Sequence, residues 1–469
     1  MNNWSGNLTY NTDRLIQLSS IAELQDYIRK YGAAKVLGTR HCFNDIADSG
    51  MRSRDRLIWL EGIEPDITLN RDGDKATAGT VTLGAALRYG QLAEFLQAQG
   101  LALHNLASLP HISVAGACAT ATHGSGNRNG SLSTAVSGME ILTASGEIVE
   151  VSREKDGERF NGMVVHLGGL GIVTRITLKV EPAYLVRQDA YEGLSFGTLE
   201  GHFEEIMGAG YSVSLFTNWQ GGIFEAVWIK SKVAAGQGTA PAGAYAAVVA
   251  DGPDSAPLAP GPAAAQAGFT GAAPDFFGAR AATHNLHPIP GLSGEICTEQ
   301  MGVPGPWHER LPHFKMGFTP SSGEELQSEY FVAREDAYAA IKAVERLKNA
   351  ITPLLLISEI RTVDADGFWM SPCYWQPCAS IHFTWKRDWG AVSRVLPLIE
   401  QALEPFNARP HWGKLFTMQP ERIRQLYPKL AAFRELMAYY DPEGFFRNAF
   451  LERNLSFPDR TPSSRDRTP

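Results

Sequence analysis

The sequence predicts an α+β protein built from two large regions. Between about Leu15 and Val180, short apolar runs alternate with short amphipathic stretches, and turn residues separate them. A Glu181-Pro182 break then separates this region from the rest of the chain. The length of 469 residues and the hydrophobic content of 44% are sufficient for two or three domains with large cores.

The first helices and strands have recognisable ends. A capping box, Ser20-Ile21-Ala22-Glu23, predicts the start of a helix that continues to about Tyr31, where Gly32 ends it. Ala33 to Leu37 is typical of a short buried strand. A second helix is predicted from about Tyr89 to Gln99, because leucine and phenylalanine side chains recur on one face.

Three strands follow in the first region. Two are predicted at about Met139 to Thr143 and Glu147 to Ser152, joined by an Ala-Ser-Gly turn. From Ile172 to Val180, apolar and polar residues alternate, which indicates a half-buried strand.

These patterns predict four segments. The first domain covers 1–182, and a second domain over 183–410 forms a separate layer above it. Within the second domain, 233–282 is rich in Ala, Gly and Pro and is expected to be a surface insertion that is at least partly disordered. Apolar and aromatic density returns in 411–455, and the polar tail 456–469 is expected to be flexible.

Composition excludes several classes of function. The net charge of -8 and the pI of about 5.9 give no support for a nucleic-acid partner. The sequence has no apolar run of about 18 residues, and Met1-Asn2-Asn3-Trp4 does not resemble a signal peptide, so we expect a cytoplasmic protein without a membrane partner. The five cysteines are scattered, which favours reduced thiols and predicts no metal site.

The most informative short segment is Gly38-Thr39-Arg40-His41-Cys42-Phe43-Asn44, which directly follows a predicted strand. A turn in this position can aim successive backbone N–H groups at a phosphate. A histidine within it would lie near a bound dinucleotide. Taken alone, a histidine in a glycine turn such as His41 is more often a hydrogen-bonded structural residue than a covalent anchor.

A longer run of small residues extends from Asn105 to Gly126. It allows a flat ligand to lie against backbone, and its serine and threonine hydroxyls can bind pyrophosphate oxygens and polar ring edges. It matches neither a dinucleotide-binding glycine fingerprint nor a phosphate-binding loop of nucleotide triphosphatases. Farther on, Leu167 to Thr174 leads into a strand whose main chain could face an adenine.

Several polar residues in the second half of the chain are explained either by an ordinary structural role or by a role in a functional site. Glu359 and Arg361 are two positions apart, so on a strand they share one face, either in a cavity or in a surface salt bridge. His382 lies in an apolar strand, where a core histidine is the ordinary explanation. Lys414, between aromatic residues and a glycine, either extends to solvent or is functionally buried.

Together these segments resemble the vanillyl-alcohol-oxidase type of FAD-dependent flavoproteins, in particular the alditol oxidases, whose C-terminal domain is similar to that of the aldonolactone oxidases. The resemblance covers roughly Trp4 to Lys230 and Leu286 to Phe450. It rests on the following segments: Leu106 to Gly116, Tyr211 to Phe216, Gly302 to Phe314, Phe318 to Tyr330, Glu359 to Val363, His382 to Trp385 and His411 to Phe416.

The resemblance implies a two-subdomain PCMH-type FAD-binding domain over 1–182 and an α+β substrate (cap) domain with a large antiparallel sheet over 183–410. Segment 411–455 would complete the active site and pack on the FAD domain. FAD would be bound covalently through His41. The implied cofactor-binding residues are Gly38, Thr39, Arg40, His41, Cys42, Phe43, Asn44, Ser108, Ser113, Gly116, Thr120, Ala121, Thr122, His123, Val173, Thr384 and His411. In this loop, Thr39, Arg40 and Cys42 replace a serine, a glycine and a serine that are common in the family.

The implied activity is oxidation of the terminal primary alcohol of an alditol, such as xylitol or sorbitol, to the aldose, with O2 reduced to hydrogen peroxide. The family assigns catalytic roles to Glu359, Arg361, His382 and Lys414. It assigns substrate binding to Ser108, Gln327, Glu359, Arg361 and Lys414. His382 is the preferred base and neutral Lys414 the alternative. Ala107 is small enough to admit oxygen to the flavin.

Other functions stay open at this point. A sugar-1,4-lactone oxidase or dehydrogenase, or a glycerol oxidase, would share the same flavin domain. A flavin-binding or carbohydrate-binding protein without turnover is a further alternative, although it would not need Glu359, Arg361, His382 and Lys414 together. The expected partners are a small polyol and O2, and the expected oligomeric state is a monomer.

Overall fold

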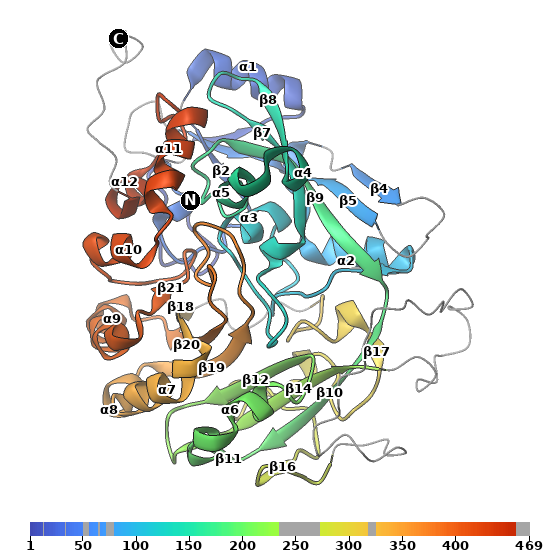
Figure 1. Ribbon diagram of the computed structural model, residues 1–469, viewed down its shortest axis with the longest axis vertical. Helices are drawn as coiled ribbons and strands as arrows, with labels where there is room; N and C mark the ends of the chain where they lie inside the picture. The colour runs from blue at the N-terminus through green and yellow to red at the C-terminus, as the bar shows by residue number, and fades with distance from the viewer. Residues whose placement is uncertain are drawn as a thin grey trace.

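The computed structural model describes residues 1–12, 14–32, 34–49, 56–63, 66–71, 79–233, 273–317 and 325–455. Figure 1 shows the strands of the first region above a large sheet formed by the second, with strand β9 running between the two. The predicted tail 456–469 and residues 234–272 of the predicted insertion lie outside the described residues.

The first region contains two sheets. An antiparallel sheet has the order β4-β5-β9-β7-β8, with β6 paired to β9. A short parallel sheet has the order β1-β3-β2. Their strands are β1 (Leu15–Gln17), β2 (Lys35–Leu37), β3 (Leu57–Trp59), β4 (Ile67–Arg71), β5 (Gly79–Gly84), β6 (Leu101–Ala102), β7 (Val136–Leu142), β8 (Ile148–Ser152) and β9 (Ile172–Pro182).

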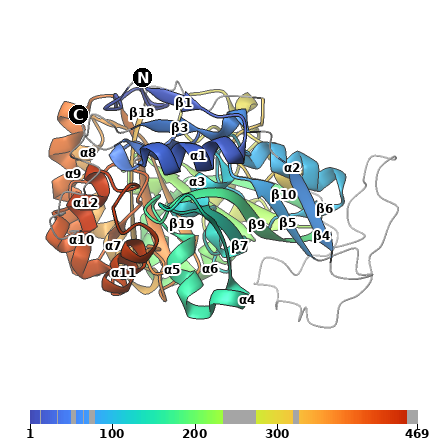
Figure 2. The same ribbon diagram turned by 90° about the horizontal axis from the view of Figure 1, so that it is seen from above.

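Helices cover these sheets. From the first region come α1 (Ile21–Tyr31), α2 (Tyr89–Ala98), α3 (Val114–Ala119), α4 (Arg153–Asp156) and α5 (Phe160–Val164), and from the end of the chain α10 (Pro420–Leu426), α11 (Leu430–Tyr440) and α12 (Ala449–Leu455). Figure 2 shows α9 to α12 on one side of the molecule and β4 and β5 on the other. Buried aromatic residues of the C-terminal helices, such as Phe433 and Phe450, belong to the same hydrophobic core as the first region.

The predicted helix ends are confirmed. Ser20 caps α1 by accepting a hydrogen bond from the Glu23 amide, and Gly32 ends the helix with a φ of 75°. The Glu23 carboxylate accepts from the Ser19 amide, one residue before the predicted partner. Strand β9 continues through Glu181 and Pro182, so the predicted break falls at the end of that strand and not before it.

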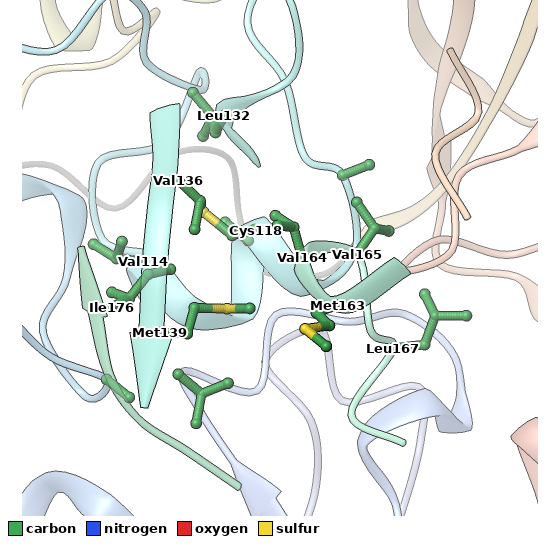
Figure 3. Packing of buried hydrophobic residues seen from close by; sticks show 14 of the residues in the cluster. Val114, Cys118, Leu132, Val136, Met139, Met163, Val164, Val165, Leu167 and Ile176 are labelled. Atoms are coloured by element: carbon green, nitrogen blue, oxygen red, sulfur yellow. The ribbon is translucent and has the colours of Figure 1, made fainter. Parts of the chain in front are cut away.

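The core of the first region is closely packed around α3. Figure 3 shows Val114 and Cys118 of this helix facing Val136 and Met139 of β7, with Met163 and Val164 of α5 beside them. The short helix lies directly after Ser113, within the small-residue run. Its packing holds that run against the sheet.

The second region forms a ten-stranded sheet in the order β15-β16-β10-β14-β12-β19-β20-β18-β21, with β17 paired to β10. All its pairings are antiparallel, as predicted. The strands are β10 (Leu185–Glu192), β12 (Ser212–Thr217), β14 (Ala226–Lys232), β15 (Asp275–Phe276), β16 (Ala279–Ala281), β17 (Gly305–Pro306), β18 (Glu325–Ala333), β19 (Leu355–Val363), β20 (Cys378–Lys386) and β21 (Arg409–Pro410). A separate pair is formed by β11 (Leu194–Ser195) and β13 (Ile223–Phe224).

The C-terminal end of the predicted insertion is ordered. Residues 275–281 form β15 and β16, and β16 pairs with β10 at the edge of the large sheet. Phe276 is buried, and its ring lies 5.1 Å from that of Tyr191. Composition alone marked this stretch as loose, because the buried contact is with a strand more than 80 residues earlier in the sequence.

The two faces of the large sheet differ in chemistry. One face packs against α6 (Leu199–Met207), α7 (Ala337–Glu345), α8 (Lys348–Ile351) and α9 (Trp389–Leu403), and residues such as Leu326, Ile360 and Phe383 lie in that core. Side chains alternate along a strand, so the neighbours Gln327, Glu359 and His382 point to the opposite face. This polar face is directed toward the first region.

Among the described residues, none of the helices has both the length and the apolar composition needed to cross a bilayer.

Candidate active site

A cavity of about 320 Å³ lies between the loops of the first region and the polar face of the large sheet. It brings together residues that are several hundred positions apart in the sequence. The site residues predicted from the sequence that line it are Gly38, Thr39, Arg40, His41, Cys42, Phe43, Ser108, Ser113, Gly116, Thr120, Thr122, His123, Val173, Gln327, Glu359, Arg361, His382, Thr384, His411 and Lys414, and Ala107 also lines it.

Asn44 and Ala121 are placed differently from the other predicted residues. The structure does not include them in the cavity lining. The Asn44 amide donates to the carbonyl oxygens of Trp412 and Lys414, at 2.8 and 2.7 Å. Ala121 is buried with a φ of 54° at the end of the small-residue run. Both residues therefore shape the loops around the cavity.

His41 is held by neighbouring rings. The Trp4 ring centroid lies 4.5 Å from that of His41, and the His111 ring lies 5.4 Å away. The His41 Nδ1 atom is buried and has no hydrogen-bond partner among the described residues. Burial, followed by the positive charge at neighbouring groups, lowers the pKa of His41 to about 3. The imidazole is therefore neutral and has a free nitrogen at the cavity.

The loop around His41 has backbone geometry that glycine normally provides. Arg40 has a φ of 60°, in the left-handed region. A glycine, which the resemblance implies at this position, would adopt this conformation without strain, and Arg40 adopts it as well. Its guanidinium donates to the Asn2 carbonyl oxygen, and its own carbonyl accepts from the Trp4 amide at 2.8 Å.

Two glycines allow close packing of backbone beside this loop. A Cβ atom at Gly38 or at Gly116 would lie 2.7 Å from the Ser113 hydroxyl oxygen, which is shorter than a van der Waals contact. Side chains at these positions would therefore displace Ser113. The small residues keep a strip of backbone and hydroxyl groups open along the cavity wall.

These features fit FAD. The wall next to His41 is built from small residues and backbone, which suits a flat ring and a pyrophosphate, and it continues past Thr120 to His166 and Gly168. His41 supplies an unpartnered buried nitrogen at one end of this strip. Within the described residues, no group of three or more His, Cys, Asp or Glu side chains gathers as a metal site requires.

The far wall of the cavity is a row across three strands. Glu329 of β18, His382 of β20 and Glu359 of β19 are aligned by the strand register. Arg361 follows Glu359 by two residues on β19, so the two side chains lie on the same face of the strand. The predicted shared face of Glu359 and Arg361 is thus observed, and both residues are 5% exposed.

Glu329 is the centre of a buried charge cluster. Its carboxylate pairs with the Lys414 ammonium at 2.6 Å and with Arg361 Nη2 at 2.8 Å, and His123 Nε2 lies 3.2 Å from it. Burial acts to raise the pKa of Glu329, but Lys414 and Arg361 outweigh it and hold the pKa well below its usual range. Burial lowers the pKa of Lys414, against the opposing effect of Glu329.

Glu359 contacts both His313 and Arg361. His313 Nε2 lies 2.7 Å from Glu359 Oε1, and Arg361 Nε lies 3.6 Å from Glu359 Oε2. Burial would raise the pKa of Glu359, yet Arg361 and His313 outweigh it and lower the pKa far below the usual range. Glu359 therefore remains a carboxylate, which accepts hydrogen bonds and does not donate them.

His382 has a defined neighbour on the next strand. Its Nε2 atom lies 3.2 Å from Gln327 Oε1, and the Gln327 amide nitrogen donates to Glu325 at 2.6 Å. Since Gln327 uses its amide N–H toward Glu325, its oxygen accepts from His382 Nε2–H. Burial and the nearby Lys414 charge lower the pKa of His382 well below 6.5. The imidazole is therefore neutral, with Nδ1 as its acceptor.

Backbone hydrogen bonds join the two halves at the cavity. The Phe43 amide donates to the Gly413 oxygen at 2.8 Å, and the His313 amide donates to the Ser108 oxygen at 3.1 Å. The Leu415 amide donates to the Gln327 oxygen at 2.8 Å. The loop that carries Lys414 is thereby fixed both to the His41 loop and to the large sheet.

Three buried residues of this network were not assigned a role from the sequence. They are Glu329, His313 and Lys230. Glu329 and His313 lie inside two segments that carry the family resemblance, Phe318 to Tyr330 and Gly302 to Phe314. Their location in these segments was the sequence signal that could have identified them as site residues. Lys230 directly follows the apolar run Ala226–Ile229, and no sequence pattern indicated that it is buried.

This arrangement defines a class of protein, the FAD-dependent oxidoreductases. A family model described as an FAD binding domain matches residues 13–152. A second, described as D-arabinono-1,4-lactone oxidase, matches residues 324–454 and so includes the whole charged row.

Whole-chain comparisons are more specific. The alditol oxidase of a Streptomyces species is 42% identical over 451 residues, covering 96% of this chain and 97% of that protein. The chain belongs to the alditol oxidase family. It is also 24% identical to an L-gulono-1,4-lactone dehydrogenase of Mycobacterium tuberculosis, over 97% of this chain and 98% of that protein. A solvent-stable cholesterol oxidase has the same fold, with a TM-score of 0.71 at 14% identity over 97% of both chains.

Proposed function

We propose that this protein oxidises the terminal primary alcohol of an alditol such as xylitol or sorbitol to the aldose, and reduces O2 to hydrogen peroxide. The reaction removes two electrons and two protons from the substrate and adds them to O2. The observation that carries the proposal is the convergence of Arg361, Lys414 and Glu359 on a cavity whose opposite wall holds His41. Bound FAD would supply the redox chemistry by accepting a hydride and passing its electrons to oxygen.

The two cations would bind the reacting oxygen. Removing hydride from an alcohol carbon requires the hydroxyl proton to leave with it or before it. Arg361 and Lys414 share the Glu329 carboxylate, so they are held side by side with hydrogen-bonding capacity left over. Placed at the substrate hydroxyl, they would stabilise the developing alkoxide.

His382 is our candidate for the proton acceptor. Its neutral ring offers Nδ1, because Nε2–H is engaged with Gln327. A positioned base of this kind typically contributes about 10²–10⁴-fold to a rate. Lys414 is a poorer candidate, since its 2.6 Å ion pair with Glu329 opposes the loss of its proton, although burial lowers its pKa.

The remaining polar groups would recognise the polyol. Glu359 and Gln327 would accept hydrogen bonds from further hydroxyls, and Ser108 would complete the set near the cofactor. A substrate that lacks one of these hydroxyls leaves a buried group unpaired, which costs binding free energy. The other predicted cavity residues of the first region would contact FAD. The predictions of a monomer and of a cytoplasmic location stay predictions.

We propose that His41 holds FAD covalently through a ring nitrogen bonded to the 8α-methyl carbon of the flavin. The support is the free, buried Nδ1 atom at the cavity wall. A neutral imidazole has the lone pair that such a bond requires, and the lowered pKa of His41 keeps it neutral at physiological pH.

The decisive experiment is a panel of substrates assayed by hydrogen peroxide release. We expect xylitol and sorbitol to be oxidised with higher kcat/KM than glycerol or D-arabinono-1,4-lactone. The lactone is the alternative substrate because the family model over residues 324–454 carries that description. Faster oxidation of the lactone would replace the alditol assignment. A cofactor that xylitol reduces without oxygen, and that air fails to reoxidise within minutes, would exclude an oxidase.

A further inference from the structure

A buried lysine lies behind the charged row and outside the cavity lining. Lys230 is on β14 and is 1% exposed. Its ammonium donates to the carbonyl oxygens of Leu311 and Pro312, at 2.5 and 3.1 Å, and lies 3.2 Å from His313 Nδ1. An ammonium has three N–H donors and no acceptor, so these three contacts use its full capacity.

The lysine determines which nitrogen of His313 carries hydrogen. Burial lowers the pKa of Lys230 to about 7, but the two carbonyl oxygens and the ring nitrogen around Nζ are the surroundings of an ammonium, which can only donate. His313 Nδ1 then accepts, and the single proton of the neutral ring is on Nε2, which faces the Glu359 carboxylate. That nitrogen lies 2.7 Å from Glu359 Oε1. Burial lowers the pKa of His313 to about 4, which agrees with a neutral ring.

The surroundings of His313 hold the ring in this orientation. The rings of Trp228 and Phe216 meet it edge to face, at 5.1 and 5.7 Å. Its backbone amide donates to Ser108, and its carbonyl accepts from the Thr298 amide at 2.9 Å. The backbone of His313 is therefore fixed and its ring is packed between aromatic side chains, so turning the ring would break its contacts with both Lys230 and Glu359.

We propose that Lys230, acting through His313, is a positioning residue that fixes Glu359 Oε1 and leaves Oε2 as the acceptor for a substrate hydroxyl. This inference rests on the role of Glu359 in the proposed function. With the other tautomer, a nitrogen lone pair would face Oε1 and repel it. The carboxylate would then rotate or take up a proton, and in either case Oε2 would be lost as a fixed acceptor.

The test compares variants of the flavin-loaded full-length protein with xylitol as substrate. Lys230→Met keeps the length of the side chain and removes the donors, and Lys232→Met is the matched control. Lys232 is on the same strand and is more exposed, and it pairs with Glu181 at 2.8 Å. We expect Lys230→Met to raise KM about 10- to 100-fold, the effect of losing a charge-assisted hydrogen bond, with a smaller change in kcat. Lys232→Met should keep the native KM.

A second pair of variants changes the histidine. His313→Gln can accept from Lys230 through its oxygen and donate to Glu359 through its nitrogen, so it should retain most of the native KM. His313→Phe fills similar space without either contact, and it should behave like Lys230→Met. We call the contact chain from Lys230 through His313 to Glu359 the relay. An equal rise in KM in both His313 variants, with flavin absorbance unchanged, would contradict the relay. This pair also tests the relay if Lys230→Met fails to fold.

The closing measurement is a double-mutant cycle with Glu359→Gln. If Lys230 acts through Glu359, then Lys230→Met should have little further effect on kcat/KM in the Glu359→Gln background. If the effects of Lys230→Met and Glu359→Gln on kcat/KM multiply, Lys230 does not act through Glu359. That result, or a native KM for Lys230→Met alone, would overturn the relay and leave the proposed function standing. Native kinetics in Glu359→Gln itself would count against the proposed role of Glu359 in the active site, and the relay would fall with it.

Discussion

At the scale of single residues, Glu329 is the carboxylate on which the two proposed catalytic cations depend. Its side chain is fully buried, and its two oxygens are divided between Arg361 and Lys414. Taking charges out of water is costly, and the cost is offset only while each has a partner. The contact with His123 then extends the cluster toward the first region.

Replacing Glu329 by glutamine should therefore destabilise the protein and abolish most turnover. The amide keeps the shape but removes the carboxylate partner of Lys414 and leaves Arg361 with only its longer contact to Glu359, at 3.6 Å. Removing one partner of a buried ion pair typically costs about 3–5 kcal/mol in the free energy of unfolding. We expect kcat to fall by at least about 100-fold, because Arg361 and Lys414 lose their common position. Denaturant unfolding and steady-state assays measure the two effects.

The stability difference between the native protein and Glu329→Gln should depend on pH in one direction. The pKa of Glu329 is lower in the folded protein than its usual value near 4.5, so the unfolded chain binds more protons between the two values. Native stability is therefore fully present above about pH 4.5 and falls as the pH is lowered further. Glu329→Gln lacks this term, so the difference between the two proteins should shrink in acid. A difference that grows in acid would show that the carboxylate is not ionised in the fold.

At the scale of elements, the active site depends on contacts between loops that are far apart in the chain. The His41 loop and the loop that carries Lys414 are joined by the Asn44 amide and by the Phe43 backbone. Neither loop belongs to a helix or strand, so these bonds fix the distance between the two walls of the cavity.

We expect Asn44→Ala to lower kcat about 10-fold while FAD remains bound. The change removes two hydrogen bonds to the Trp412 and Lys414 carbonyls and leaves them unsatisfied, at a cost of about 1–3 kcal/mol in stability. Lys414 then loses its fixed position near the substrate. The measurement is kcat together with the flavin absorbance of the purified protein. Asn70→Ala, which removes exposed hydrogen bonds on β4, is the matched control, and an equal loss of activity there would contradict a specific role for Asn44.

The sequence predicted the elements better than the contacts between them. Capping at Ser20 and the alternation that places Glu359 beside Arg361 depend on residues a few positions apart, so the local pattern was sufficient. Glu329 occurs in an ordinary strand sequence, and its partner Lys414 is 85 positions away. No local periodicity encodes such a pair. For the same reason, β15 and β16 were taken for part of a loose insertion, since their partner strand is distant.

At the scale of the whole molecule, the cavity exists only because the chain returns to its first region after forming the large sheet. Trp412 and the helices α10 to α12 share the hydrophobic core of the first region, while Gln327 and Glu359 belong to the sheet. A cofactor in this cavity would contact both halves. Its binding energy would therefore stabilise the complete fold, and dissociation would weaken the contact between the halves.

Replacing His41 by alanine should make the stability of the whole molecule depend on free FAD. In the native protein a covalent bond would prevent dissociation, so the temperature of unfolding should be insensitive to added FAD. In His41→Ala the flavin should be released by acid precipitation. The variant should unfold at a lower temperature. Added FAD at about 100 times its dissociation constant should raise its free energy of unfolding by about 2.7 kcal/mol.

His111→Ala is the control, because the His111 ring lies 5.4 Å from that of His41. The yellow flavin of this variant should remain bound to the protein. Release of flavin from the native protein by acid would show that FAD is not covalently attached, whereas retention in His41→Ala would place the attachment at another residue.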